Sequence, residues 1–197
     1  LTLNELKIEK NICIVLATMH PISRDLSLTK LEIFEFLEGL KIFSNLTKSK
    51  IIITAPNNDN GNEIIKNAIK KYLPSIQNCI YVESLGGKRY QSIMSLAKTR
   101  NIIICGNSSS VIKEAPFYGA HSLNIGERQA GRESASTQID CLAKRNLISQ
   151  NLIKLSNKNC CIGENPYFKK SPTKNVIEFI EKIFTEKTLK EIMFKKW

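Results

Sequence analysis

The sequence lacks any apolar run close to the ~20 residues that a membrane-spanning helix needs. Its longest candidate is interrupted by His20 and Pro21. The first ten residues carry acidic side chains and lack the apolar centre of a signal peptide. Position 1 is not Met, so we expect the chain to be a fragment of a longer protein. These absences favour a cytoplasmic protein with no membrane partner.

The six cysteines form no C-x-x-C pair and show no paired spacing of the kind that binds zinc. Cys13, Cys79 and Cys105 lie within apolar runs, where cysteine behaves as a small buried hydrophobe. We therefore expect all six to be reduced and structural, and we expect no metal site.

Aromatic residues are scarce, at 7% of the chain, and they are not interleaved with the basic residues. The balance of 29 basic against 18 acidic side chains gives a net charge of +11, which raises the question of nucleic-acid binding. However, the lysines are spread along the whole chain, as on a solvated surface. We therefore expect no nucleic-acid partner. A positive field still favours anionic ligands such as diphosphates.

Short β-branched runs alternate with amphipathic stretches along the chain. The runs predict strands at 12–18, 50–55, 78–82, 101–105 and 121–125. The stretches between and after them predict helices near 28–47, 62–73, 88–98, 108–118, 145–156 and 173–190. Continuous apolar strands that alternate with helices indicate a parallel sheet covered on both faces. The predicted fold is thus α/β, a Rossmann-like doubly wound sheet.

We see no internal repeat and no linker, so we expect one domain from residue 1 to residue 197. From about Lys158 the pattern is less regular. We expect this last part to pack against a part of the protein outside the domain.

The loop Gly-Asn-Ser-Ser-Ser at 106–110 leads directly into a predicted helix. Ligands of open parallel sheets bind beyond the carboxyl ends of the strands, and free N–H groups at a helix start bind phosphate. Ser108, Ser109 and Ser110 are therefore candidate phosphate-binding residues, with simple helix capping as the alternative. Glu114 follows on the same helix. It could accept hydrogen bonds from both ribose hydroxyls, or be a solvated glutamate.

The loops after the other strands add further candidates. His20 directly follows the first strand and is one of only two histidines. Arg128 and Arg132 flank Gly131, an arrangement that suits a diphosphate, although a solvated basic loop has the same pattern. Asp59 is expected to cap the following helix.

These segments resemble the hydrolysing UDP-N-acetylglucosamine 2-epimerases, over roughly residues 12 to 180. The similar motifs are Thr18-Met19-His20-Pro21, Pro56-Asn57-Asn58-Asp59, Ser84-Leu85-Gly86, Gly106-Asn107-Ser108-Ser109-Ser110 with Glu114-Ala115-Pro116, and Asn124-Ile125-Gly126-Glu127-Arg128-Gln129 with Gly131-Arg132. The serine–glutamate segment and the segment around Arg128 are the specific parts.

The resemblance implies one half of a GT-B-like enzyme with two Rossmann-like domains, of which this chain matches the second. It implies that Ser108 binds the diphosphate, Glu114 binds the ribose, and the loop with Ser84 and Leu85 receives the uracil. His20 would face the diphosphate and support catalysis. The resemblance implies no cofactor. We expect the full-length enzyme to be a homo-oligomer.

The implied reaction converts UDP-N-acetylglucosamine and water to N-acetylmannosamine and UDP, in sialic-acid-type sugar biosynthesis. The resemblance places the carboxylates for proton transfer in the other half, so the chain alone should be inactive. Two alternatives stay open: the donor-nucleotide domain of a GT-B glycosyltransferase, and a non-catalytic nucleotide-sugar-binding module. The sequence also leaves open which N-acetylated sugar, and which of uridine and guanosine, is bound.

Overall fold

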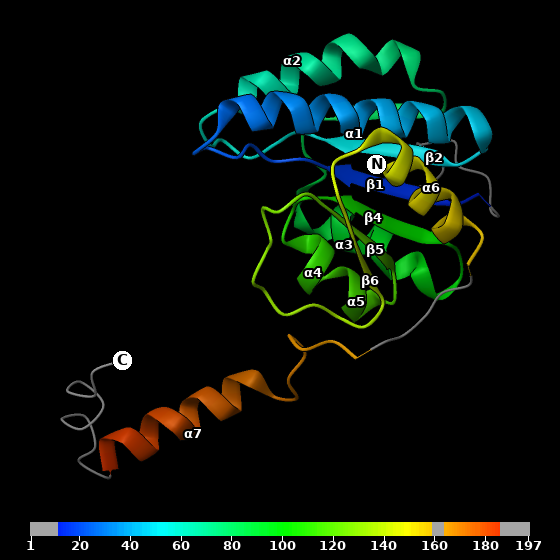
Figure 1. Cartoon of the computed structure of the whole chain (residues 1–197). Helices are drawn as coiled ribbons and strands as arrows, with labels where there is room; N and C mark the ends of the chain where they lie inside the picture. The colour runs from blue at the N-terminus through cyan, green and yellow to red at the C-terminus, as the bar shows by residue number, and fades with distance from the viewer. Residues whose placement is uncertain (1–11, 159–163, 186–197) are drawn as a thin grey trace. The chain divides into compact units, whose positions relative to one another are not determined.

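The computed structural model describes residues 12–158 and 164–185 (Figure 1). The chain divides into two compact units, which are described separately: the first extends to Asn165, and the second begins at Pro166. Within the described ranges, no helix is long and apolar enough to cross a membrane. The expectation of one domain from residue 1 to residue 197, with a C-terminal part that packs on another part of the protein, stays a prediction.

The first unit is built on a sheet of six parallel strands in the order β3-β2-β1-β4-β5-β6. The strands are β1 (Ile14–Thr18), β2 (Lys50–Thr54), β3 (Cys79–Val82), β4 (Ile102–Gly106), β5 (His121–Ile125) and β6 (Gln138–Cys141). The predicted α/β class and doubly wound parallel sheet are confirmed. The strand order reverses between β1 and β4, and ligands of such sheets bind beside this point.

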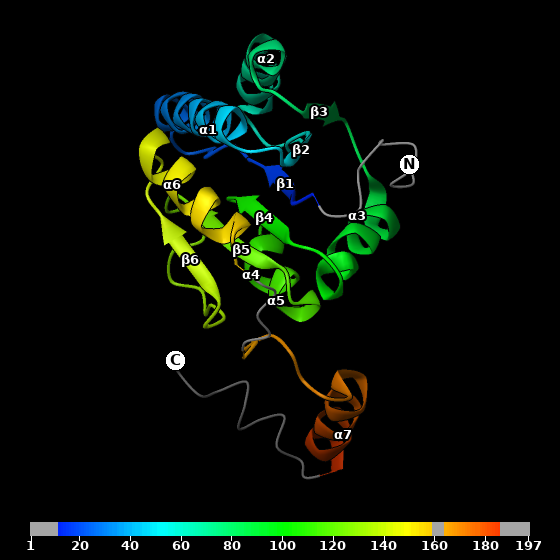
Figure 2. The ribbon, with the colours of Figure 1, turned by 90° about the vertical axis from the view of Figure 1, so that its right-hand side faces the viewer.

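Helices cover both faces of the sheet (Figure 2). One face carries α1 (Leu26–Leu46), α2 (Asn62–Tyr72) and α6 (Arg145–Ser156). The other face carries α3 (Gly86–Ser95), α4 (Ser110–Lys113) and α5 (Ala115–Tyr118). Two short 3-10 turns, η1 (Leu73–Ser75) and η2 (Leu96–Lys98), follow α2 and α3.

The central strands are apolar because both of their faces are buried. In β1, Val15 and Ala17 face the α1 side, whereas Ile14 and Leu16 face the α3 side, and all four are fully buried. Burying one such side chain contributes about 1.5–3 kcal/mol. This packing gives a rigid platform, and the loops at its carboxyl edge are held in place by it.

Two local predictions were wrong. β6 was not predicted, because its sequence QIDC is short and carries polar Gln138 and Asp140 on one face. The predicted helix over 108–118 is instead two helices of four residues that meet at Glu114. Pro116 explains the break, since it has no N–H and its ring clashes with the preceding turn.

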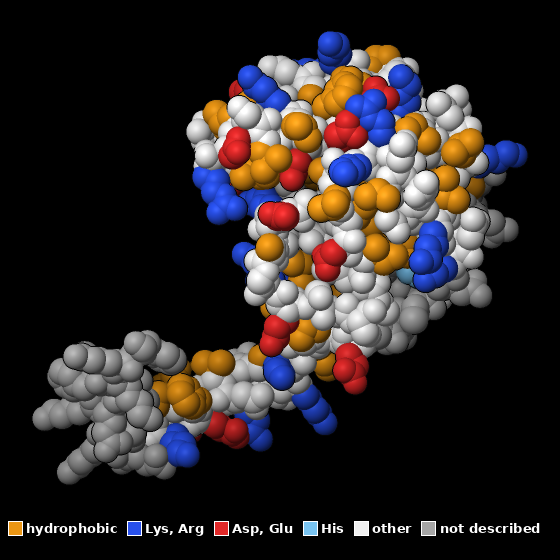
Figure 3. Space-filling model, viewed as in Figure 1, with side chains coloured by type: hydrophobic (Ala, Val, Ile, Leu, Met, Phe, Trp, Pro, Cys, Tyr) orange, Lys and Arg blue, Asp and Glu red, His pale blue; other side chains and the backbone are white. Residues whose placement is uncertain are grey.

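The cysteines of the described residues are free thiols, and Cys160 and Cys161 lie outside this part of the chain. Burial raises the pKa of Cys13 and of Cys79 to about 12, so both thiols stay protonated. On the face drawn in Figure 3, Lys and Arg side chains lie scattered among acidic and apolar ones and form no single basic patch.

The second unit contains α7 (Pro172–Thr185). Its apolar side chains recur at helical spacing and are exposed: Val176 by 56%, Phe179 by 60% and Phe184 by 70%. Lys174 and Glu178 form an i,i+4 ion pair of 3.6 Å. An exposed apolar stripe on an amphipathic helix marks a contact surface.

Candidate functional site

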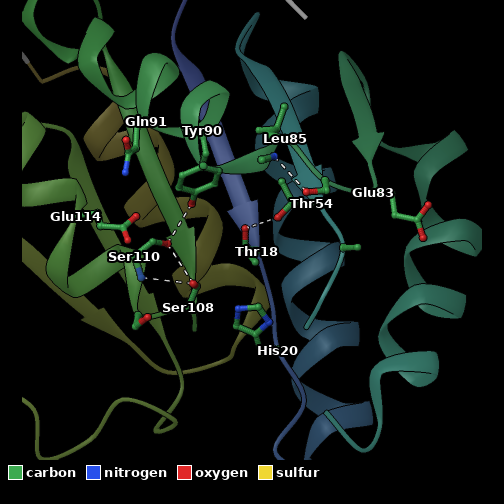
Figure 4. A pocket seen from close by; sticks show the side chains of 15 residues that line it. Thr18, His20, Thr54, Glu83, Leu85, Tyr90, Gln91, Ser108, Ser110 and Glu114 are labelled. Atoms are coloured by element: carbon green, nitrogen blue, oxygen red, sulfur yellow. Dashed lines mark hydrogen bonds between the residues drawn. The ribbon is translucent and has the colours of Figure 1, made fainter. Parts of the chain in front are cut away.

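A cavity of about 380 Å³ lies at the carboxyl edge of the sheet, beside α3 and α4 (Figure 4). Its volume is within the range of small-ligand pockets. The lining includes the predicted catalytic residue, His20, and six of the residues predicted to bind the substrate: Ser84, Leu85, Ser108, Ser109, Ser110 and Glu114. Their loops are far apart in the sequence and meet here because parallel strands end at one edge.

The floor of the cavity depends on a close approach of the ends of β1 and β4. Thr18 and Gly106 are paired in register, and Gly106 has a φ of 129°. A Cβ atom at this position would lie 1.9 Å from the Thr18 carbonyl oxygen. Only glycine satisfies both the backbone angle and the contact. The serine loop therefore starts directly beside the end of β1.

Hydroxyl groups of separate elements are hydrogen-bonded along the cavity wall (Figure 4). Thr18 and Thr54 share a bond of 2.6 Å between their hydroxyls. The Tyr90 hydroxyl bonds to Ser110 Oγ at 3.1 Å, and Ser110 Oγ donates to Ser108 Oγ at 3.1 Å. Burial raises the pKa of Tyr90, so its phenol stays neutral. Because a hydroxyl both donates and accepts, this wall can direct its protons toward an anion.

Two backbone N–H groups of the serine loop are unused. The N–H of Asn107 donates to the Thr18 carbonyl, and the N–H of Ser110 donates to Ser108 Oγ. By contrast, the N–H groups of Ser108 and Ser109 find no acceptor within residues 12–158 and 164–185. Adjacent free N–H groups form a concave donor site for anionic oxygens. Since α4 has only four residues, these amides and hydroxyls, rather than a long helix dipole, are what the loop offers.

The two ends of the cavity differ in chemistry. In Figure 4, Leu85 lies at the end opposite His20, and Glu114 lies to one side between them. Leu85 is only 5% exposed, and beside it the Ser84 hydroxyl accepts from the N–H of Gly86 at 3.1 Å. The Glu114 side chain is exposed and accepts no hydrogen bond from the described residues. The Leu85 end of the cavity therefore offers an apolar surface and backbone groups, and the free Glu114 carboxylate lies nearby.

His20 lies at the other end and is held from two directions. The fully buried Asn107 side chain accepts from the His20 N–H at 2.7 Å and donates to the His20 carbonyl at 2.9 Å. The backbone N–H of Asn57 donates to His20 Nδ1 at 3.0 Å. Burial, and then the charge of Arg128, lower the pKa of His20 to about 4, although the charge of Asp59 opposes the shift. The imidazole is therefore neutral at pH 7.

The two arginines lie in different places. Arg128 donates to the Asn107 carbonyl at 3.3 Å, and its guanidinium is 3.7 Å from the Asp59 carboxylate. It therefore adjoins His20 without being part of the cavity lining. Arg132 is exposed and lines a second hollow of about 330 Å³ between the β5–β6 loop and β6, together with Gln129. The structure does not bring Arg132 into the first cavity.

Asp59 does not cap α2, contrary to the prediction. The residue before α2 is Gly61, and no side chain caps this helix. The Asp59 carboxylate instead accepts from Asn57 Nδ2 and faces Arg128. Asp59 thus couples the β2–α2 loop to the β5–β6 loop behind His20.

The chain as a whole also matches a known protein family. The family model described as UDP-N-acetylglucosamine 2-epimerase matches residues 2–181. This chain belongs to that family. It is 34% identical over 158 residues to the GDP/UDP-N,N'-diacetylbacillosamine 2-epimerase (hydrolyzing) of Campylobacter jejuni, covering 78% of this chain and 38% of the relative. It is 27% identical over 172 residues to the polysialic acid biosynthesis protein P7 of Escherichia coli, covering 85% and 42%.

The fold is also that of solved epimerases. The UDP-GlcNAc 2-epimerase of Neisseria meningitidis, solved with UDP-GlcNAc, superimposes with a TM-score of 0.69 at 19% identity. The match covers 91% of this chain and 48% of that structure. The chain thus spans less than half the length of the epimerases that it matches, as one half of a GT-B-like fold does.

Several residues in and beside the first cavity were not predicted as site residues. Thr18 and Thr54 end adjacent strands, and their position at the sheet edge was a usable signal. Tyr90 was not among the predicted site residues, and Asn107 was predicted only as part of the loop that leads into the helix. The long-range bonds of Asn107 to His20 leave no sequence pattern.

Among the described residues, no group of three or more His, Cys, Asp or Glu could hold a metal ion.

Proposed function

We propose that this chain is the UDP-binding half of a hydrolysing UDP-N-acetylglucosamine 2-epimerase, and that UDP binds in the first cavity. The observation that carries the proposal is the pair of free N–H groups at Ser108 and Ser109, set in a cavity with a free carboxylate at Glu114. Anionic oxygens need donors, and a ribose diol needs an acceptor. The family match supports the same ligand class.

We propose that UDP lies along the cavity in one direction. The diphosphate lies at the serine loop and His20, with Arg128 behind them. The ribose hydroxyls donate to Glu114. The uracil lies at the Leu85 end, where Gly86 and Gly87 leave open space, since a Cβ at either would meet nothing within 4 Å.

The reaction that we propose for the two-domain enzyme begins with removal of the sugar C2 proton. The C1–O bond to UDP then breaks, and UDP leaves with the bonding electrons, giving a glycal. Water adds across the double bond, and the product is the 2-epimer as a free sugar. Fixed donors stabilise the charge that develops on the leaving diphosphate. This chain contributes that part, and the carboxylates for proton transfer lie in the other half.

The names of two relatives bear on which sugar the enzyme uses and on its role in the cell. The Campylobacter jejuni relative is named for a diacetamido sugar, so a diacetamido analogue of UDP-N-acetylglucosamine belongs in the assay. The Escherichia coli relative is named for polysialic acid biosynthesis, which supports a role in sialic-acid-type sugar synthesis.

We also propose that α7 contacts the other half of the enzyme through Val176, Phe179 and Phe184. These side chains are exposed, and the chain spans less than half the length of its relatives. Amide hydrogen exchange in α7 should be slower in a two-domain protein than in the 197-residue chain, with α2 as the reference helix. Equal exchange of α7 in both would contradict this contact.

The function is tested in a two-domain protein that contains this chain. It should release UDP and the free 2-epimer without an acceptor, and His20→Ala should lower the rate by orders of magnitude. The control is Lys98→Ala, which changes an exposed side chain away from the cavity. The 197-residue chain alone should be at background.

Other outcomes would overturn the proposal. Turnover that requires an acceptor would identify a glycosyltransferase. Binding without turnover in the two-domain protein would identify a non-catalytic module. Epimerisation by the 197-residue chain alone would place the base among its own acids.

A further inference from the structure

The hydrogen bonding of His20 decides which ring nitrogen is protonated. The backbone N–H of Asn57 lies 3.0 Å from Nδ1 and points at it. An amide N–H can only donate, so Nδ1 must present its lone pair. In a neutral imidazole the hydrogen then resides on Nε2. The donor in this bond is the backbone N–H of residue 57, so the bond does not depend on the side chain at that position.

The backbone that carries the ring is fixed by long-range hydrogen bonds. Asn107 brackets the His20 backbone on both sides, at 2.7 and 2.9 Å, and is itself fully buried. The Asn107 carbonyl is in turn fixed by Arg128 and by Gln129, whose amide donates to it at 2.7 Å. His20, in the loop that follows β1, is therefore held by the loops that follow β2, β4 and β5.

The charges around the ring also oppose a cationic His20. The charged groups that act on it are Arg128 and Asp59, of opposite sign, and they face each other at 3.7 Å. Burial and Arg128 both disfavour the imidazolium and outweigh Asp59, and together they lower the pKa of His20 to about 4. Protonation of Nδ1 would in addition set its N–H against the N–H of Asn57.

The remaining nitrogen is available to a ligand. Nε2 has no hydrogen-bond partner within the described part of the chain. Nδ1 and Nε2 point in different directions from the imidazole ring. In Figure 4, one of the two ring nitrogens lies on the side of the ring that is nearer to Ser108. His20 itself lines the cavity.

We propose that His20 binds the diphosphate as a fixed neutral donor through its Nε2–H, with the Asn57 amide and Asn107 as its positioning groups. The inference rests on the proposed function for the identity of the ligand. In this role His20 transfers no proton and carries no charge. It adds a directed hydrogen bond next to the free amides of the serine loop, and the cationic charge comes from Arg128.

The protonation state is measured on the 197-residue chain without ligand, by NMR of the imidazole nitrogens. The chain has two histidines, so the signals that disappear in His20→Gln belong to His20. We expect an unprotonated Nδ1 and a protonated Nε2 that persist from pH 8 to pH 5, below the ordinary pKa of histidine. An imidazolium at pH 6, or a proton on Nδ1, would overturn the proposal.

The role toward the ligand is tested by UDP titration of two variants. The carboxamide of Gln reaches about as far as Nε2, whereas that of Asn reaches about as far as Nδ1. We expect His20→Gln to bind UDP within a few-fold of the wild type and His20→Asn to bind it roughly 10-fold or more weakly, as for loss of a hydrogen bond to a charged group. Equal losses in the two variants would overturn the donor role of Nε2.

The pH dependence separates a neutral donor from a cation. The ratio of UDP affinities of wild type and His20→Gln cancels the titration of UDP itself. This ratio should be constant from pH 8 to pH 5.5. A ratio that rises as the pH falls would show that His20 binds as an imidazolium. If UDP does not bind the wild type at all, the proposed function fails, while the nitrogen signals still report the tautomer.

Discussion

Glu32 provides a prediction that depends on burial and on one close contact. It lies on the buried side of α1, is only 5% exposed, and its Oε2 atom has no hydrogen-bond partner among the described residues. A Cβ atom on Gly126 would lie 2.5 Å from Glu32 Oε1, so the carboxyl group lies directly against the β5–β6 loop. Burial, and then the charge of Glu127, raise the pKa of Glu32 to about 7.

The sign of the effect follows from proton linkage. A carboxyl whose pKa is raised by folding holds its proton more tightly in the folded state. Its contribution to stability is complete below the unfolded pKa of 4.5 and is lost as the pH rises toward 7. With about 1.4 kcal/mol per pKa unit, the loss between pH 5 and pH 8 is about 2 kcal/mol.

Glu32→Gln should remove this loss. We expect the free energy of unfolding of Glu32→Gln, relative to the wild type, to be about 2 kcal/mol higher at pH 8 than at pH 5. Any pH-independent cost of the amide cancels in this difference, and so does the titration of His20. Urea unfolding at both pH values measures it. As a second variant, Glu127→Gln should reduce the pH dependence, because it removes the like charge. A relative stability of Glu32→Gln that is the same at both pH values would refute the reasoning.

Three further predictions concern the cavity. Gly106→Ala should lower the free energy of unfolding by roughly 3–5 kcal/mol, because of its φ of 129° and the 1.9 Å contact; an unchanged urea midpoint would contradict this. Ser108→Ala should weaken UDP binding by about 1 kcal/mol, or roughly fivefold, in calorimetry, whereas Ser95→Ala should not change it. Glu114→Gln should bind UDP and 2′-deoxy-UDP about equally, while Glu133→Gln keeps the wild-type preference for UDP. A preference for UDP that survives in Glu114→Gln would remove its ribose role.

The sheet was predictable because its strands are buried on both faces. Continuous apolar runs such as Ile51 to Ile53 leave a strong pattern, and all five strands predicted from such runs are present. β6 carries polar Gln138 and Asp140, whose side chains bond to each other on one face of an edge strand. A short strand of this kind resembles a loop in sequence, so its place in the sheet was not predictable.

The positions of the site residues were predictable to the extent that strand ends are. Ser108 and Glu114 meet in one cavity because their loop follows β4 directly. Arg128 and Arg132 had similar sequence signals, yet one adjoins His20 and the other lines the second hollow. The path of the long β5–β6 loop decides this difference. It depends on contacts such as that of Gln129 with the Asn107 carbonyl, which no local pattern records.

The central claim, that UDP binds in the cavity at the carboxyl edge of the sheet, is tested most directly by NMR titration of the 197-residue chain with UDP. Amide shifts should occur at Thr18, Leu85, Ser108 and Ser109, with a dissociation constant in the micromolar-to-millimolar range expected of half a cleft. AMP serves as the control nucleotide and should bind more weakly. Shifts confined to the amino edge of the sheet, or no shifts at millimolar UDP, would contradict the account.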